Sequence, residues 1–153
     1  MINIYNGEIS IPEYNTVLRK EMTEIELQNT KFYKILKDIR KFENGYSWFD
    51  FNSFQFKNWK ILLQICFKNS LLNTIELTTI EDNDSKTWNE WSEKEQINIY
   101  KRNSQFLKEI LLKKGNESKD KRLIEYDFEW GSVYSTFDKK SASCNIGVKY
   151  NLT

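Results

Sequence analysis

The sequence predicts an α+β fold: an antiparallel β-meander sheet with one long helix packed on one face, giving two layers. Large apolar residues recur at every second position in 59–67, 124–130 and 142–150, as in strands with one buried face. Between these segments, 93–114 contains no Gly or Pro and carries apolar residues at helical spacing. The helix is therefore expected to cover the buried face of the sheet.

The first 42 residues predict their secondary structure less clearly than the rest of the chain. Four isoleucines alternate around Gly7, which predicts a short strand or hairpin. Thr23 and Glu26 have capping-box spacing, which predicts a short helix over 24–29. The segment 31–42 fits a strand and a helix equally well, because its apolar residues also follow a 3.6-residue period.

The central strands are separated by turn signals. Asn44-Gly45 is the strongest, since both residues tolerate the positive φ angles of a type I′ hairpin. Lys57-Asn58 and Lys68-Asn69-Ser70 predict two further turns. The aromatic stretch 46–56 and the alternating stretch 59–67 are then successive strands, and 71–78 continues the meander.

The polar segment 81–91 predicts a loop. Ser92 and Glu95 repeat the capping-box spacing, so the long helix is expected to begin at Glu93. Its end is predicted at Lys113-Lys114, with Gly115 as the residue that terminates it.

The C-terminal third is again β-type, with one buried and one wet face. Gly131 is expected to permit a bulge or a close backbone approach after Trp130, and Asp138 is expected to close a hairpin turn. The length of 153 residues predicts a single domain over 1–153.

Composition excludes several classes of function. The chain has no histidine, which rules out Ser-His-Asp and Cys-His nucleophiles and His-ligated zinc. Its 23 basic and 22 acidic residues give a charge of +1, so nucleic acid and membrane surfaces are not expected partners. The two cysteines predict buried free thiols, and no cofactor or metal is expected. Without a signal peptide or a long apolar span, we expect a cytoplasmic protein.

The net charge is near zero, but the acidic and basic residues are unevenly distributed along the chain. Segment 76–95 has seven acidic and two basic residues, whereas 101–122 has eight basic and three acidic residues. Acidic groups beside tryptophans suit a basic protein partner, although a solvated loop over packed tryptophans has the same pattern. The candidate partner-binding residues are Trp88, Trp91, Glu81, Asp82, Asp84 and Glu90.

Two alternatives remain open. Glu125, Asp127 and Glu129 would share one face of a strand at about 6–7 Å spacing, which suits a carboxylate-dependent hydrolase and equally a solvated strand face. The aromatic stretch 46–56 is interpreted as core rather than a ligand platform, because it almost lacks Arg and Lys. A large apolar patch there would instead indicate a structural or scaffold subunit.

A resemblance favours binding. The segment YDFEWGSVYSTFDKKSASCNIGVKY (126–150), with WNEWS (88–92) upstream, resembles a group of small uncharacterised bacterial proteins. In that group an aromatic-Trp-Gly turn precedes a strand, an Asp-centred turn and a final alternating strand. Those proteins resemble immunity proteins of polymorphic and contact-dependent toxin systems. The resemblance fits the N-terminal half poorly and carries over no catalytic residue. It implies a non-enzymatic protein that covers the active site of a cognate toxin. From the residues themselves we expect electrostatic steering by the acidic segment, with Trp88 and Trp91 as buried anchors.

Overall fold

A computed structural model describes residues 1–86 and 90–151 of the chain. In chain order the elements, including two 3-10 helices labelled η, are β1 (Ile9–Ile11), η1 (Pro12–Tyr14), β2 (Thr16–Leu18), α1 (Glu24–Gln28), η2 (Lys31–Ile35), β3 (Leu36–Lys41), β4 (Tyr46–Phe51), β5 (Phe54–Phe56), β6 (Trp59–Lys68), β7 (Leu71–Thr79), α2 (Glu93–Leu111), β8 (Asn116–Glu117), β9 (Leu123–Phe128), β10 (Gly131–Asp138) and β11 (Ser143–Tyr150).

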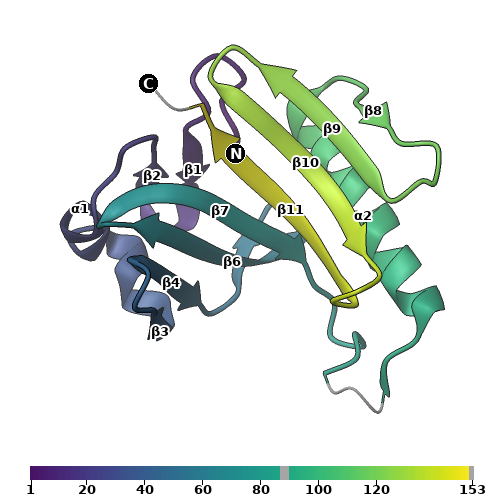
Figure 1. Cartoon of the computed structure of the whole chain (residues 1–153), viewed down its shortest axis with the longest axis horizontal. Helices are drawn as coiled ribbons and strands as arrows, with labels where there is room; N and C mark the ends of the chain where they lie inside the picture. Colours follow the sequence, from purple (N-terminus) through teal and green to yellow (C-terminus); the bar gives the residue numbers. More distant parts are fainter. Residues whose placement is uncertain (87–89, 152–153) are drawn as a thin grey trace.

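One antiparallel sheet forms most of the molecule (Figure 1). Its strands lie in the order β3-β4-β6-β7-β11-β10-β9-β8, and β5 pairs with the beginning of β6. Helix α2 packs against β10, β11 and β7, and the small β1–β2 hairpin lies behind the β6–β7 half of the sheet. The predicted α+β architecture, a sheet with one long helix on one face, is confirmed.

The sheet consists of two meanders that meet at β11. Strands β3 to β7 follow one another in space, as do β9 to β11. The two groups join where β11 pairs with β7, between Ile146↔Leu77 and Lys149↔Thr74. The last strand of the chain therefore returns to the centre of the sheet, a position that periodicity alone did not predict.

Alternation along the strands sends apolar side chains to the inner face, under the helices. On β6 these are the residues whose spacing predicted the strand. The four phenylalanines of 46–56 are also buried, and Phe51 stacks on Phe32 with ring centroids 4.3 Å apart. The interpretation of this stretch as core is confirmed for its phenylalanines.

The chain segment before β1 is hydrogen-bonded to the end of β11 and to the turn between β9 and β10. The Tyr150 hydroxyl donates to the carbonyl of Gly7 at 2.8 Å, and the Trp130 indole N–H donates to the carbonyl of Ile4 at 3.0 Å. A Cβ at Gly7 would lie 2.5 Å from the Trp130 ring, so only glycine permits this contact. These contacts hold the N-terminal segment against the end of the sheet formed by β10 and β11.

The predicted hairpin turns are present, but their geometry differs from the expectation. Gly45 has a positive φ of 87° and donates to the carbonyl of Phe42, while Asn44 has no positive φ. The loop is therefore a type I turn with a glycine bulge. Type I′ geometry occurs instead at Asn69 and Ser70, where φ is 51° and 68°. Two adjacent residues with positive φ match the right-handed twist of β6 and β7.

The short N-terminal elements follow local signals. Thr23 and Glu26 form both hydrogen bonds of the predicted capping box, and α1 begins at Glu24 as expected. The ambiguous segment 31–42 contains both structures in succession, a 3-10 helix and then β3.

Helix α2 begins at Glu93 as predicted but ends earlier than expected. Its last residue is Leu111, and Leu112, with φ 54°, closes it in place of Gly115. Gly115 has another role, because a Cβ there would lie 2.8 Å from the Tyr126 ring. Of the helices in the described ranges, none is long and apolar enough to span a membrane.

A buried polar cluster joins α2 to the end of β7. Asn103 is fully buried, and its amide oxygen accepts from the Thr79 N–H at 2.9 Å and the Thr79 hydroxyl at 2.7 Å. The neighbouring Arg102 donates to the same residue, at its hydroxyl (2.9 Å) and its carbonyl (2.8 Å). These directional bonds set the position of the helix along the sheet.

We predict that Asn103→Ala lowers the free energy of unfolding by about 3 kcal/mol, since it leaves the Thr79 N–H and hydroxyl buried without an acceptor. Chemical denaturation of the purified chain measures this change. Asn98→Ala, on the exposed side of the same helix, is the matched control and is expected to be neutral or slightly stabilising. Equal losses in the two variants would contradict the role assigned to Asn103.

Candidate functional site

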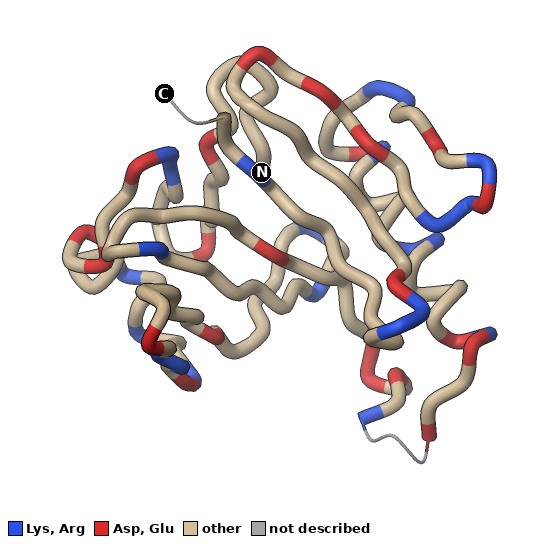
Figure 2. The backbone as a smooth tube through the Cα atoms, in the orientation of Figure 1, with Lys and Arg blue, Asp and Glu red and all other residues tan. Residues whose placement is uncertain are grey.

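The predicted acidic segment connects the end of β7 to the start of α2 (Figure 2). Of the two tryptophans expected to anchor a partner, Trp88 lies outside the described residues, and Trp91 is 38% exposed. Asp82, with a side chain 95% exposed, makes an ion pair of 3.2 Å with Lys60 on β6. The segment therefore presents both apolar and acidic groups to solvent.

Arg102 pairs with two of the predicted acidic residues. Its guanidinium donates to both carboxylate oxygens of Asp84, at 3.1 and 2.6 Å, and forms a longer ion pair of 3.5 Å with Glu81. Only 15% of the Arg102 side chain is exposed. Asp84 is thus mainly a structural residue that fastens the loop to α2, a role that its charge alone did not reveal.

The far end of the acidic segment is also held in place. The Ser85 hydroxyl donates to the carbonyl of Glu90 and to the carboxylate of Glu95, and the Lys86 N–H donates to the carboxylate of Glu90 at 3.0 Å. The Ser92 hydroxyl caps α2 by accepting from the Glu95 N–H, which is one of the two hydrogen bonds of the predicted capping box. The Glu95 carboxylate accepts from the Ser85 N–H. Glu90 therefore contributes to loop order as well as to surface charge.

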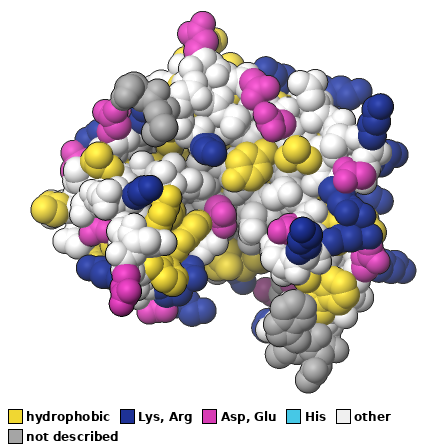
Figure 3. All heavy atoms as spheres, in the orientation of Figure 1, with side chains coloured by type: hydrophobic (Ala, Val, Ile, Leu, Met, Phe, Trp, Pro, Cys, Tyr) yellow, Lys and Arg dark blue, Asp and Glu magenta, His cyan; other side chains and the backbone are white. Residues whose placement is uncertain are grey.

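A second candidate site is the face of the sheet opposite the helices, here called the open face (Figure 3). A cavity of about 400 Å³ lies on it, over β3, β4, β6, β7 and β11. A broader cavity of about 680 Å³ adjoins the first, because Glu76 and Asn145 line both. We call the combined hollow the trough.

The strand pairing aligns one row of mostly polar residues across the open face, and part of this row lines the trough. Starting at β3 and ending at β8, the paired residues are Asp38, Asp50, Gln64, Glu76, Gly147, Tyr134, Glu125 and Asn116. At Gly147 the absence of a side chain makes room for Tyr134, whose ring carbon Cζ would lie 2.1 Å from an added Cβ. The Tyr134 ring thus crosses β11 toward Glu76.

Hydrogen bonds connect the first half of this row. Arg40 makes a two-pronged ion pair with Asp50, at 3.0 and 3.1 Å, and donates to the Gln64 side-chain oxygen at 3.2 Å. The Gln64 amide in turn donates to Glu76 at 2.9 Å. Burial raises the pKa of Glu76, while Gln64 and the more distant Arg40 lower it to a smaller extent. Among the described residues, Glu76 makes no ion pair.

The three carboxylates of the hydrolase hypothesis do not share one strand face. Glu125 and Asp127 lie at alternate positions of β9 on the open face, whereas Glu129 lies in the turn after the strand, which ends at Phe128. A hydrogen bond with Asp127 is the main cause that raises the pKa of Glu125, followed by burial and charge repulsion. Asp127 and Glu129 are exposed. The expected spacing therefore holds for two of the three residues.

The predicted C-terminal turns and thiols are confirmed. At Gly131 an added Cβ would lie 2.0 Å from the carbonyl oxygen of Lys149, and Asp138 accepts from the Lys140 N–H at 2.9 Å. Cys66 and Cys144 are free and buried. Burial raises the pKa of Cys144 to about 12, which keeps the thiol protonated at neutral pH.

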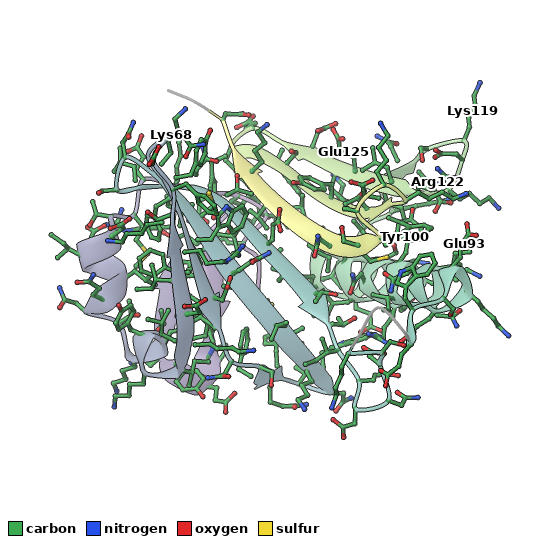
Figure 4. The ribbon with its side chains drawn as sticks, turned by 60° about the horizontal axis from the view of Figure 1, so that its bottom comes forward. Lys68, Glu93, Tyr100, Lys119, Arg122 and Glu125 are labelled. Carbon is green, nitrogen blue, oxygen red and sulfur yellow. The ribbon has the colours of Figure 1, made fainter. Side chains whose placement is uncertain are left out.

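A third cavity, of about 500 Å³, lies between α2 and the loop before β9. Figure 4 places Glu93, Tyr100 and Arg122 at this end of the molecule, away from Lys68. The Tyr100 hydroxyl donates to Glu117 at 3.1 Å, and Lys139 pairs with Glu93 at 3.1 Å. Residues 1–86 and 90–151 contain no cluster of three or more His, Cys, Asp or Glu suited to a metal ion.

Comparisons with known proteins add no relative. No protein-family model matches the chain, and neither curated proteins nor solved structures give a significant match.

We predict that Arg102→Lys loosens the acidic segment, because an ammonium group cannot reproduce the paired bonds to Asp84 and the bonds to Thr79. The free energy of unfolding should fall by roughly 1–2 kcal/mol. Hydrogen exchange should accelerate about tenfold at the amides of Glu81 and Asp84. Lys101→Arg at the exposed neighbouring position is the control, and similar exchange rates in both variants would contradict this prediction.

We predict that Glu76→Gln stabilises the chain at pH 8. Because folding raises the pKa of Glu76, its contribution to stability is complete below the unfolded value of 4.5 and is lost as pH rises through the folded value. Glutamine retains an oxygen for Gln64 and avoids the buried charge. The melting temperature should rise by roughly 2–4 °C at pH 8, which corresponds to about 1 kcal/mol, and the difference should shrink at pH 4. A variant less stable than the parent chain at pH 8 would contradict it.

Proposed function

We propose that the chain is a non-enzymatic, cytoplasmic binding protein that recognises a basic surface on a protein partner, and specifically an immunity protein that neutralises a cognate bacterial toxin. The binding surface is centred on the acidic segment and the first half of α2. The immunity role rests on the resemblance of 126–150 and 88–92 to small proteins of that type, and the binding role on the geometry of the segment.

The observation that carries the binding role is the exposure of Trp91 and of several carboxylates in and next to the loop between β7 and α2. Trp91 is 38% exposed, and the side chains of Glu81, Asp82 and Glu93 in the same stretch of chain are more than half exposed. Ile97, which is 37% exposed on the first half of α2, adds a second apolar group at the edge of this surface, where it lines the third cavity together with Lys101 and Arg122. An aromatic anchor inside a charged rim is the arrangement that protein interfaces favour.

The order of the segment supports the same role. Arg102 holds Asp84 and Glu81, and Glu95 holds Ser85, so less conformational entropy is lost when a partner docks. The exposed carboxylates would accelerate encounter with a positively charged surface. By contrast, Asp127 and Glu129 of the hydrolase hypothesis are exposed to water and line none of the three cavities described above.

Growth assays test this function. Each open reading frame that flanks the gene of this chain is expressed in a heterologous bacterium, with and without the chain. We expect one of the two products to stop growth by itself and the chain to restore it. The double variant Trp91→Ala, Ile97→Ala should reduce rescue at least tenfold in viable counts, because it removes both apolar anchors.

Ile25→Ala is the matched control, since Ile25 is an equally large exposed residue on α1 and should leave rescue unchanged. Circular dichroism establishes that both variants are folded. If neither flanking product is toxic, or if the chain does not relieve toxicity, the immunity role is wrong. Full rescue by the folded double variant would instead remove the Trp91–Ile97 surface from the binding site.

A further inference from the structure

We propose that the trough on the open face is a pocket for the guanidinium group of an arginine side chain presented by a protein partner, with Glu76 as the residue that receives it. The proposal depends on the proposed function only in naming a protein as the source of the arginine. It adds a second recognition site on the open face of the sheet, apart from the loop between β7 and α2.

The charge of Glu76 favours a cationic ligand in the trough. Around the trough, Arg40 bonds to Asp50 through two hydrogen bonds, and Lys37 and Asp38, which both line the first cavity, contribute one charge of each sign. Glu76 remains as a partly buried carboxylate whose described partner is the neutral Gln64 amide. The charge of Arg40 favours ionised Glu76 only from a distance and less than burial disfavours it, so a cation in direct contact with the carboxylate would improve the balance.

The shape of the trough suits a long side chain. The cavity of about 400 Å³ over Glu76 exceeds the volume of one long side chain and is open at the surface. Leu62 is 40% exposed on the wall of the cavity, and the aliphatic stem of an arginine can pack against it. Gly147 keeps the neighbouring strand free of a side chain, so the Tyr134 ring bounds the cavity beyond Glu76.

The acceptors in the trough favour a guanidinium group over an ammonium group. A guanidinium carries five N–H donors in a planar fork and needs acceptors in more than one direction. The trough offers the Glu76 carboxylate and the side-chain oxygen of Asn145, which lines both cavities on the adjoining strand. Bidentate pairing with a carboxylate is stronger and more specific than contact with a point charge.

The test uses a peptide, so that it does not require the natural partner. The 15N-labelled chain is titrated with acetyl-Gly-Arg-Gly-amide to millimolar concentrations. We expect saturable chemical-shift changes at the amides of Gln64, Glu76 and Asn145. The same peptide with citrulline, which has the shape of arginine without its charge, should not saturate. Glu76→Gln should weaken binding of the arginine peptide at least tenfold.

Glu43→Gln is the matched control, because it removes one negative charge from the exposed β3–β4 loop and should leave peptide binding unchanged. Equal binding of the citrulline peptide, or undiminished binding by Glu76→Gln, would overturn the proposal. Spermidine that binds at these residues as tightly as the arginine peptide would also overturn it, in favour of a free polyamine. Because growth rescue depends on Trp91 and Ile97 and peptide binding on Glu76, each result can fail without the other.

Discussion

The position of the long helix depends on two adjacent residues, Arg102 and Asn103, which both bond to Thr79 at the end of β7. Apolar contacts alone would hold α2 against the sheet but would allow it to slide, because burial has little directional preference. Hydrogen bonds have a required geometry, and a buried Thr79 N–H without an acceptor would be costly. The cluster therefore selects one position for α2, and with it the path of the segment that leads from β7 into the helix.

The same cluster decides what the charge pattern of the sequence means. The acidic segment before α2 and the basic segment within and after it appear as opposite poles of a neutral chain. In the structure they are partly each other's partners, since Arg102 pairs with Asp84 and Glu81. A buried arginine is satisfied only when several acceptors surround it, and the loop supplies them. The charge left for a partner is consequently concentrated on the most exposed carboxylates, with Asp82 foremost.

Most of the fold was predictable because its signals are local. The alternation on β6 and the final strands, the capping boxes at Thr23 and Ser92, and the turn at Asn69 each depend on a few neighbouring residues. The predictions that failed concern contacts between residues that are far apart in the sequence. Gly115 looked like a helix end but serves the packing of Tyr126, and nothing near β11 indicates that it pairs with β7. Similarly, Asn103 is a polar residue in the middle of a helix, and only the strand beneath it explains its burial.

The two candidate sites also differ in how far the sequence predicts them, because one depends on neighbouring residues and the other on pairing between distant strands. A run of acidic residues beside tryptophans is visible in the sequence, whereas the trough exists only after β11 has paired with β7 and placed Gly147 beside Glu76. Between Ile75 and Leu77, Glu76 has the pattern of an ordinary solvated position on a strand. The register gives it neighbours without a charge, with Gln64 on one side and Gly147 and the Tyr134 ring on the other. A residue needed only to keep a strand face wet would be satisfied by threonine, as at the neighbouring Thr74 and Thr78. Burial disfavours a charge at this position, so its presence is better explained by what it can bind than by how it packs.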